Sequence, residues 1–337
     1  MSALLDVRDL RVRFPTAAGP LTAVDGVSLA IERGRALGIV GESGSGKTVL
    51  SLAIMGLTRF GPAQVSGQVL FEGRDLVAMP ERELRRMRGN EIAMVFQDPL
   101  SALHPFKRVG AQLVEAIRAH RTGVSRAQAR GRAVELLELV DVPEPRRRVD
   151  AYPHELSGGM RQRAMIAMAL ANEPKLLIAD EPTTALDVTV QAQILDLIRR
   201  LQRELEMAIV IITHDLGVIA ETADDVAVFY AGRVVERAPT RTLFRSPEHP
   251  YTWGLLRSMP RLDLPRGAAL VPIEGRPPSL VARPSGCSFH PRCAYRRESH
   301  AQIDPRLEPL PDDSGHEVAC LLPPEARRRL WEEARGG

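Results

Sequence analysis

The stretch Gly41-Glu42-Ser43-Gly44-Ser45-Gly46-Lys47-Thr48 decides how this chain folds. It follows ALGIV (36–40), a continuous apolar run typical of a buried strand, and it precedes the helical pattern VLSLAIMGL. The spacing G-x-x-x-x-G-K-T between a strand and a helix predicts a loop whose backbone N–H groups wrap around phosphate groups. The neighbourhood of this loop is therefore expected to be an α/β sheet with a ligand site at one edge.

All eight residues of this phosphate loop are candidates for binding a nucleoside triphosphate. Lys47 is expected to reach the β- and γ-phosphates, and the Thr48 hydroxyl to coordinate Mg²⁺. The alternative is a plain glycine-rich turn. That alternative carries little weight because lysine is scarce, the other two being Lys107 and Lys175, so a chance match to the pattern is well under ~1%.

Further buried strands are predicted where continuous apolar runs alternate with helical patterns, as in a parallel sheet covered by helices. The runs are IAMVF (92–96), LLIAD (176–180), AIVIIT (208–213) and DVAVF (225–229). By contrast, residues 5–14 and 27–31 alternate apolar with polar, which predicts half-buried antiparallel strands.

Polar residues follow three of these strands and are expected at the carboxyl edge of the sheet. Asp180 suits the Mg²⁺ shell, and Glu181 suits orienting and polarising an attacking water, with a helix cap as the alternative for both. Gln97 follows the run that begins at Ile92. His214 follows the run that begins at Ala208, and it is a candidate hydrogen-bond partner of the γ-phosphate and the water.

Length and composition exclude several classes. A chain of 337 residues with 44% hydrophobic content can bury a real core, which rules out a disordered, collagenous or minimal disulfide-bonded protein. The net charge of +3 is too near balance for binding nucleic acid or membrane by bulk charge. The N-terminus MSALLDVRDL lacks a signal-peptide pattern, and no stretch reaches the ~18 to 20 apolar residues of a membrane helix.

The organisation along the chain predicts three parts. An α/β core with an N-terminal β subdomain covers residues 1–97 and 158–237, and an all-helical subdomain is inserted at 98–157. Proline becomes frequent after this core, which predicts a loop-rich C-terminal extension (238–337) closed by a short charged helix.

The segment LSGGMRQR (156–163), which opens the helical run AMIAMALAN, closely resembles the signature motif of ABC transporter ATPases. In isolation it would be a helix start with Ser157 as its cap. Together with the phosphate loop and LLIADE (176–181), however, the resemblance covers the ABC pattern in order from about residue 5 to 237. Met160 replaces the commoner Gln, as in the oligopeptide and dipeptide importer branch.

The resemblance assigns roles to residues at the matching positions. It implies that Phe14 stacks on adenine, that Gln97 is the Q-loop residue and a Mg²⁺ ligand, and that His214 is the switch histidine. The nucleotide-binding residues that it adds come from the signature and from the D-loop Ala185-Leu186-Asp187: Ser157, Gly158, Gly159 and Asp187.

The resemblance also implies an activity and partners. The expected protein is an ATPase with ATP and Mg²⁺, a peripheral subunit at the cytoplasmic face of the cell membrane that drives uptake of peptides or similar small solutes. The expected partners are a second ABC ATPase subunit, either itself or a related chain, two transmembrane permease subunits and an extracytoplasmic solute-binding protein, with no nucleic acid. The alternatives are a non-transport soluble ABC ATPase of translation or DNA repair and a metal-sensing regulatory ATPase.

The C-terminal extension resembles the same branch in EHPYT (248–252) and IEGRPP (273–278). Several relatives carry four cysteines there that bind an iron–sulfur cluster. Here the corresponding positions are Cys287, Cys293, His300 and Cys320. A Cys₃His set predicts an iron–sulfur site, with structural zinc or no metal as the alternatives.

Overall fold

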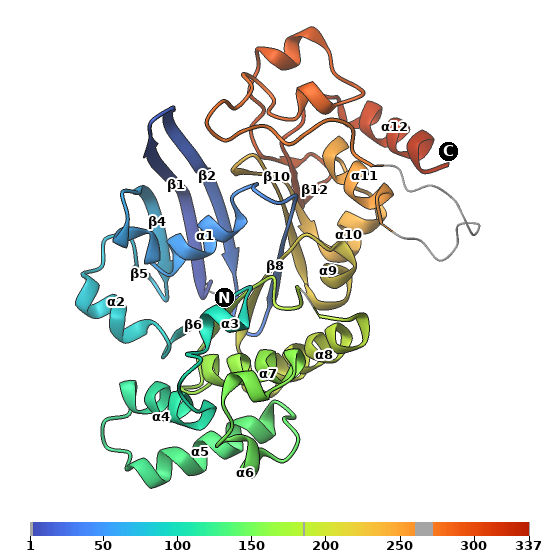
Figure 1. Ribbon diagram of the computed structural model, residues 1–337. Helices are drawn as coiled ribbons and strands as arrows, with labels where there is room; N and C mark the ends of the chain where they lie inside the picture. Colours follow the sequence, from blue (N-terminus) through green and yellow to red (C-terminus); the bar gives the residue numbers. More distant parts are fainter. Residues whose placement is uncertain (1–2, 185, 260–271, 337) are drawn as a thin grey trace. The chain divides into compact units, whose positions relative to one another are not determined.

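The computed structural model describes residues 3–184, 186–259 and 272–336. The chain divides into two compact units (Figure 1). The first unit comprises Met1–Leu4, Ile31–Arg35 and Ala78–Ile212, and the second comprises Leu5–Ala30, Ala36–Val77 and Thr213–Gly337.

The first unit is built on three parallel strands, β6 (Ile92–Val95), β7 (Leu176–Asp180) and β8 (Ala208–Thr213), with β7 in the middle. Every residue of these strands is buried, which is why the sequence shows continuous apolar runs and no alternation. Helix α7 (Gly158–Ala169) precedes β7, and α8 (Val188–Leu205) connects β7 to β8.

Residues 98–157, all of which the structure describes, contain helices and no strand. They form α3 (Pro99–Ala102), α4 (Val109–His120), α5 (Arg126–Leu139), α6 (Pro145–Arg148) and the 3₁₀ turn Pro153–Glu155. The helix α2 (Glu81–Met87) precedes β6 in the same unit. Contact density groups the helical segment with β6 to β8, so its separation as a subdomain of its own stays a prediction.

The second unit contains two sheets. The first has the order β2-β1-β4-β5, and β1 pairs antiparallel with β4, which pairs antiparallel with β5. The bounds are β1 (Leu5–Thr16), β2 (Gly19–Ile31), β4 (Gln64–Phe71) and β5 (Arg74–Asp75). Strands β1 and β2 include the two alternating stretches at 5–14 and 27–31, whereas β4 and β5 were not among the predicted strands.

The other sheet of this unit has the strand order β11-β12-β10-β9-β3. Strand β3 (Ala36–Val40) is parallel to β9 (Asp225–Tyr230), and β9 is antiparallel to β10 (Arg233–Pro239). The helices of this part are α1 (Lys47–Ile54), the 3₁₀ turn Leu57–Phe60, α9 (Leu216–Thr222) and α10 (Thr240–Arg245).

The C-terminal extension is more regular than its proline content predicts. It contains α11 (Pro250–Arg257), 3₁₀ turns at His290–Arg292 and Glu298–Ala301, β11 (Glu308–Leu310), β12 (Asp313–Val318) and α12 (Pro324–Gly336). Strand β12 pairs with β10 through Glu236 and Val318, so the extension continues the sheet that begins at β3. The predicted closing helix is present as α12, whereas β11 and β12 were not among the predicted strands, because short strands rich in charged residues lack an apolar pattern.

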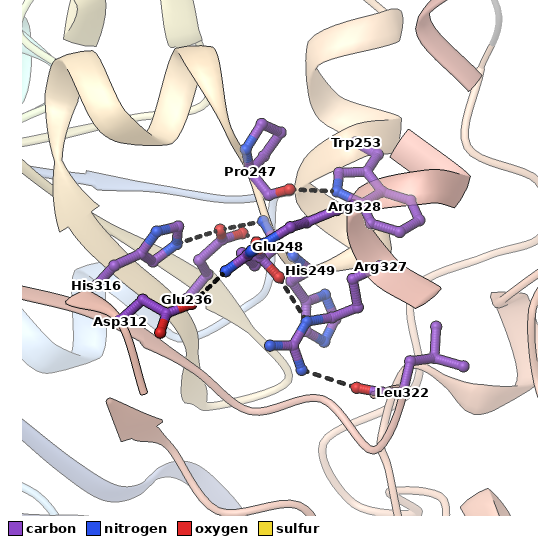
Figure 2. A network of polar contacts seen from close by, with 10 residues as sticks. All are labelled: Glu236, Pro247, Glu248, His249, Trp253, Asp312, His316, Leu322, Arg327 and Arg328. Atoms are coloured by element: carbon purple, nitrogen blue, oxygen red, sulfur yellow. Dashed lines mark hydrogen bonds and ion pairs between the residues drawn. The ribbon is translucent and has the colours of Figure 1, made fainter. Parts of the chain in front are cut away.

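A buried polar network joins β10, β12, α12 and the segment before α11 (Figure 2). Glu236 is fully buried, accepts the backbone N–H groups of Glu248 and His249, and lies 2.8 Å from Nε2 of His316. Arg327 of α12 donates to Glu248 at 2.6 Å. Buried charges are tolerated when they are paired in this way, so the network fixes the extension to β10.

None of the helices within the described ranges combines the length and the apolar composition that crossing a bilayer requires.

Candidate active site

The phosphate loop joins β3 to α1 in the second unit, and glycine is required at two of its positions. A Cβ on Gly46, whose φ is +107°, would lie 2.2 Å from the Ala23 carbonyl oxygen. A Cβ on Gly41 would lie 2.1 Å from the carbonyl oxygen of Phe229. The loop thus packs against two neighbouring strands more closely than any side chain permits.

Lys47, the first residue of α1, is buried. Its Nζ donates to the carbonyl oxygens of Gly41 at 2.7 Å and Glu42 at 2.9 Å, so the ammonium group lies inside the loop. Ser45 Oγ is also buried and makes no hydrogen bond within the described part of the chain. A buried cation, an unsatisfied hydroxyl and a helix start together fit a phosphate group.

Two further residues predicted to bind nucleotide belong to the second unit. Thr48 is exposed in the first turn of α1, where its hydroxyl can reach a ligand. Phe14 is half-buried near the end of β1.

The carboxylate of Glu181 is held in place at the end of β7 in the first unit. One of its oxygens, Oε2, accepts from Nε2 of Gln97 at 3.0 Å and from Oγ1 of Thr184 at 2.8 Å. Its backbone N–H donates to the carbonyl of Ile212, and its φ of +48° is left-handed, a conformation that non-glycine residues adopt at some energetic cost. Asp180, the preceding residue, is buried as the last member of β7.

Thr184 is a functional candidate that sequence reasoning missed. It lies three residues after Glu181, in a turn with no pattern of its own, and only the folded turn shows that its hydroxyl reaches the carboxylate.

The signature residues begin α7 in the first unit. Ser157 is the N-cap of this helix, and its hydroxyl accepts the Met160 N–H at 3.3 Å. A Cβ on Gly159 would lie 2.8 Å from Cγ1 of Val190 in α8, so this glycine permits the two helices to approach closely.

The D-loop precedes α8. Asp187 is the N-cap of α8 and accepts the N–H of Val190 at 2.9 Å. Ala185, which the resemblance places in the same loop, lies outside the described residues. Ser157 and Asp187, which are both predicted to bind nucleotide, are therefore N-cap residues of helices in the first unit.

His214 follows β8 directly and is exposed, as the sequence predicts for a residue at the carboxyl end of a strand. It belongs to the second unit, together with Phe14 and the phosphate loop. The predicted magnesium ligands are distributed over both units, with Thr48 in the second and Gln97 and Asp180 in the first.

The four predicted ligands of an iron–sulfur cluster do not form a metal site in this arrangement. Across residues 3–184, 186–259 and 272–336, no group of three or more His, Cys, Asp or Glu side chains is disposed to hold a metal ion. The backbone N–H of Cys287 donates to the carbonyl of His300. Burial raises the pKa of the Cys293 thiol to about 11 and that of the Cys320 thiol to about 12. A metal ion bound by these thiols would have to displace their protons, because metal ligation needs thiolates.

Comparison with known proteins gives two family matches. Residues 24–184 match the family described as ABC transporter, and residues 235–299 match the oligopeptide/dipeptide transporter C-terminal region. The oligopeptide transport ATP-binding protein OppD of Bacillus subtilis is 49% identical over 97% of this chain and 91% of its own length. Its namesake in Salmonella typhimurium is 50% identical over 96% of this chain and 95% of its own length.

A solved structure is similar as well. It is the ATP-binding cassette MJ0796, a dimer in a post-hydrolysis state bound to ADP and Pi. Its sequence is 28% identical to this chain, the match covers 70% of this chain and 99% of that one, and the TM-score is 0.63.

The phosphate loop after β3 and the acidic pair at the end of β7 define the class, a P-loop ATPase of the ATP-binding cassette type. The chain belongs to the ABC transporter family, in the branch of oligopeptide and dipeptide ATP-binding subunits. The family and the α/β cassette fold predicted from the sequence are confirmed, whereas the metal-binding character of the extension is not supported.

Proposed function

We propose that this chain is the ATP-hydrolysing subunit of an importer that takes up oligopeptides, dipeptides or similar small solutes through separate transmembrane subunits. One observation carries the proposal. Identity of about 50% to two oligopeptide transport ATP-binding proteins extends over nearly the full length, including the C-terminal extension that distinguishes this branch.

In this proposal the second unit binds the triphosphate. The N–H groups of the loop and the ammonium of Lys47 face the phosphates, and Phe14 stacks on the adenine. Bound ATP supplies the γ-phosphoryl group, and Mg²⁺ neutralises charge on the phosphates. The Mg²⁺ ligands are Thr48, Gln97 and Asp180.

The catalytic residues are Glu181, Gln97 and His214. Glu181 orients and polarises water, and the two hydrogen bonds to its Oε2 limit its rotation, which supports this role. His214 is exposed directly after β8, so its imidazole is accessible to a phosphate group.

The proposed ATPase subunit works together with several other proteins. The cassette is a head-to-tail dimer in which Ser157, Gly158, Gly159 and Asp187 of one subunit complete the site around Lys47 of the other. The dimer mate is either a second copy or a related ATPase. The dimer operates two permease subunits at the cytoplasmic face of the membrane, and an extracytoplasmic binding protein delivers the solute. The dimeric cassette MJ0796 supports the association of two ATPase subunits.

The proposed cofactors are ATP and Mg²⁺, and no step is assigned to an iron–sulfur cluster. Analysis of iron and acid-labile sulfide in anaerobically purified protein tests whether a cluster is bound. Stoichiometric iron and sulfide would show that Cys287, Cys293, His300 and Cys320 rearrange around a cluster.

Affinity purification from membranes of the native host tests the assignment. We expect permease subunits and a second ATPase to be recovered with the full chain, whereas recovery of ribosomal or DNA-repair proteins alone would reject it.

A matched pair of lysine variants tests the nucleotide site in the same preparation. Lys47→Ala is expected to lower ATP affinity by at least roughly tenfold, because a buried charge-assisted contact is lost. Lys107→Ala, which removes an exposed partner of Glu115, is expected to leave ATP affinity unchanged.

A further inference from the structure

Two side chains of the C-terminal extension contact the phosphate loop at Glu42. Arg292 forms a bidentate ion pair with the loop carboxylate of Glu42, with Nη1 to Oε2 at 2.6 Å and Nη2 to Oε1 at 2.9 Å. The hydroxyl of Tyr251 accepts the backbone N–H of the same residue at 2.9 Å. Both the side chain and the main chain of Glu42 are thus fixed by the extension, and all three residues lie in the second unit.

The side chain of Arg292 is buried and is held in place by several contacts. Its side chain is 4% exposed, and its Nε donates to the carbonyl of Glu274 at 2.9 Å. The guanidinium also lies over the rings of Tyr230 and Phe289, about 6 Å from each centroid. An arginine buried against two aromatic rings and hydrogen-bonded at its edge loses little freedom on pairing, so its ion pair with Glu42 is strong.

Tyr251 is equally constrained. It is fully buried at the start of α11, and its ring packs against those of Tyr230 and Phe289 at 4.5 and 5.4 Å between centroids. Burial raises the pKa of Tyr251, so the residue stays a neutral phenol that can accept the Glu42 N–H.

The charge of Glu42 gives these contacts a consequence for ligand binding. Its carbonyl oxygen accepts from Lys47 Nζ, so the residue is part of the loop that receives a polyanion. A carboxylate without a cation in that loop would repel phosphate, and repulsion over several ångströms at a partly buried site is worth about a factor of ten in affinity. Arg292 removes this repulsion without occupying the loop interior, where Lys47 lies.

We propose that Arg292 and Tyr251 are positioning residues of the nucleotide site, through which the C-terminal extension sets the affinity of the phosphate loop for a nucleoside triphosphate. This inference rests on the proposed function, because it takes ATP as the ligand of the loop. It assigns the extension a role inside the ATPase cycle in addition to its place in the fold.

Nucleotide titrations of the full-length chain test the inference. Arg292→Gln is expected to raise the Kd for ATP roughly tenfold and the Kd for ADP by less, because ADP carries less negative charge. Adding Glu42→Gln to this variant removes the unpaired carboxylate and should recover most of the lost ATP affinity. Tyr251→Phe is expected to weaken ATP and ADP binding by the same factor, because it loosens the loop without changing its charge.

The matched control is Arg296→Gln. This exposed arginine lies in the same segment and donates to the carbonyl of Pro291, so its loss changes the net charge equally without touching the loop. We expect wild-type affinity for both nucleotides. If Arg292→Gln does not fold, Arg292→Lys keeps the charge and should preserve the wild-type ratio of the two Kd values.

Equal losses of ATP and ADP affinity in Arg292→Gln, or no recovery on adding Glu42→Gln, would overturn the inference. A wild-type chain that binds no ATP would instead reject the proposed function, so the two failures are distinguishable. Wild-type ATP affinity in the folded Arg292→Gln variant would reject the inference alone.

Discussion

Gln97 donates a hydrogen bond to Glu181 although the two residues are 84 positions apart, with 3.0 Å between Nε2 and Oε2. The bond forms because β6 and β7 are neighbouring parallel strands whose carboxyl ends meet at one edge. Thr184, three residues after Glu181 in the sequence, donates to the same oxygen. A carboxylate fixed by two donors presents itself to a water molecule in one orientation, and this reduces the entropy that the reaction must lose.

Glu181→Gln is expected to abolish most ATP hydrolysis. The amide keeps the size of the side chain but cannot polarise water as a carboxylate does, and loss of such a group costs roughly 10² to 10⁴ in rate. ATP binding should persist, and the variant should accumulate as a dimer. Phosphate release, an ATP titration and size-exclusion chromatography check the three expectations.

Glu135→Gln serves as the control for this variant, because it neutralises an exposed carboxylate of α5 that pairs with Arg132. It should hydrolyse ATP at the wild-type rate. Normal turnover in Glu181→Gln would remove Glu181 from the catalytic role.

Thr184→Val is expected to lower kcat roughly tenfold while changing the Kd for ATP little. The substitution keeps the shape of the side chain and removes one hydrogen bond to the carboxylate, and such a bond to a charged group is worth about 1.5 kcal/mol. Thr184→Ser restores the hydroxyl and should recover the rate. Steady-state kinetics together with nucleotide titration separate the two quantities, and an unchanged kcat in the valine variant would show that Gln97 alone orients Glu181.

The core strands could be predicted because burial on both faces leaves a continuous apolar run. Strands β3 and β7 coincide with the predicted ranges 36–40 and 176–180. The polar residues that follow such strands could also be placed at a sheet edge, since parallel strands end together. The left-handed backbone of Glu181 could not be foreseen, because its φ results from the packing around the turn.

The contacts of the extension could not be predicted. Arg292 lies 250 positions from Glu42, and no spacing links a lone arginine to a loop so distant. Strand β12 contains the polar residues His316 and Glu317, so its sequence lacks the apolar pattern of a strand. It forms a strand because it pairs with β10. The metal site was predicted from a resemblance in spacing alone, and spacing does not establish that side chains converge.

Gly46→Ala is expected to destabilise the protein by at least about 2 kcal/mol, because a φ of +107° strains any side chain and the new Cβ would clash with the carbonyl of Ala23. Nucleotide binding should fall as well, since relief of the clash displaces the loop. Urea unfolding and an ATP titration measure the two effects. Gly123→Ala, where a Cβ meets no atom within 4 Å, should change neither, and equal stability of the two variants would contradict the close approach at Gly46.

The stability of the protein is expected to fall as the pH is lowered from 7 to 5, in part through His249. This residue is the N-cap of α11, and its Nδ1 accepts the Tyr251 N–H at 3.0 Å. Burial lowers the pKa of His249 from 6.5 to about 4, so between these values the unfolded chain binds the proton more tightly than the folded chain. The contribution is complete above pH 6.5, and about 2 kcal/mol of it is lost by pH 5.

The variant His249→Asn tests this assignment, because asparagine can still cap α11 but does not titrate. Urea unfolding at pH 7, 6 and 5 should show a pH dependence about 2 kcal/mol smaller than that of the wild type. His154→Asn removes an exposed histidine and should keep the wild-type pH dependence. Equal pH dependence in wild type and His249→Asn would contradict the contribution assigned to His249.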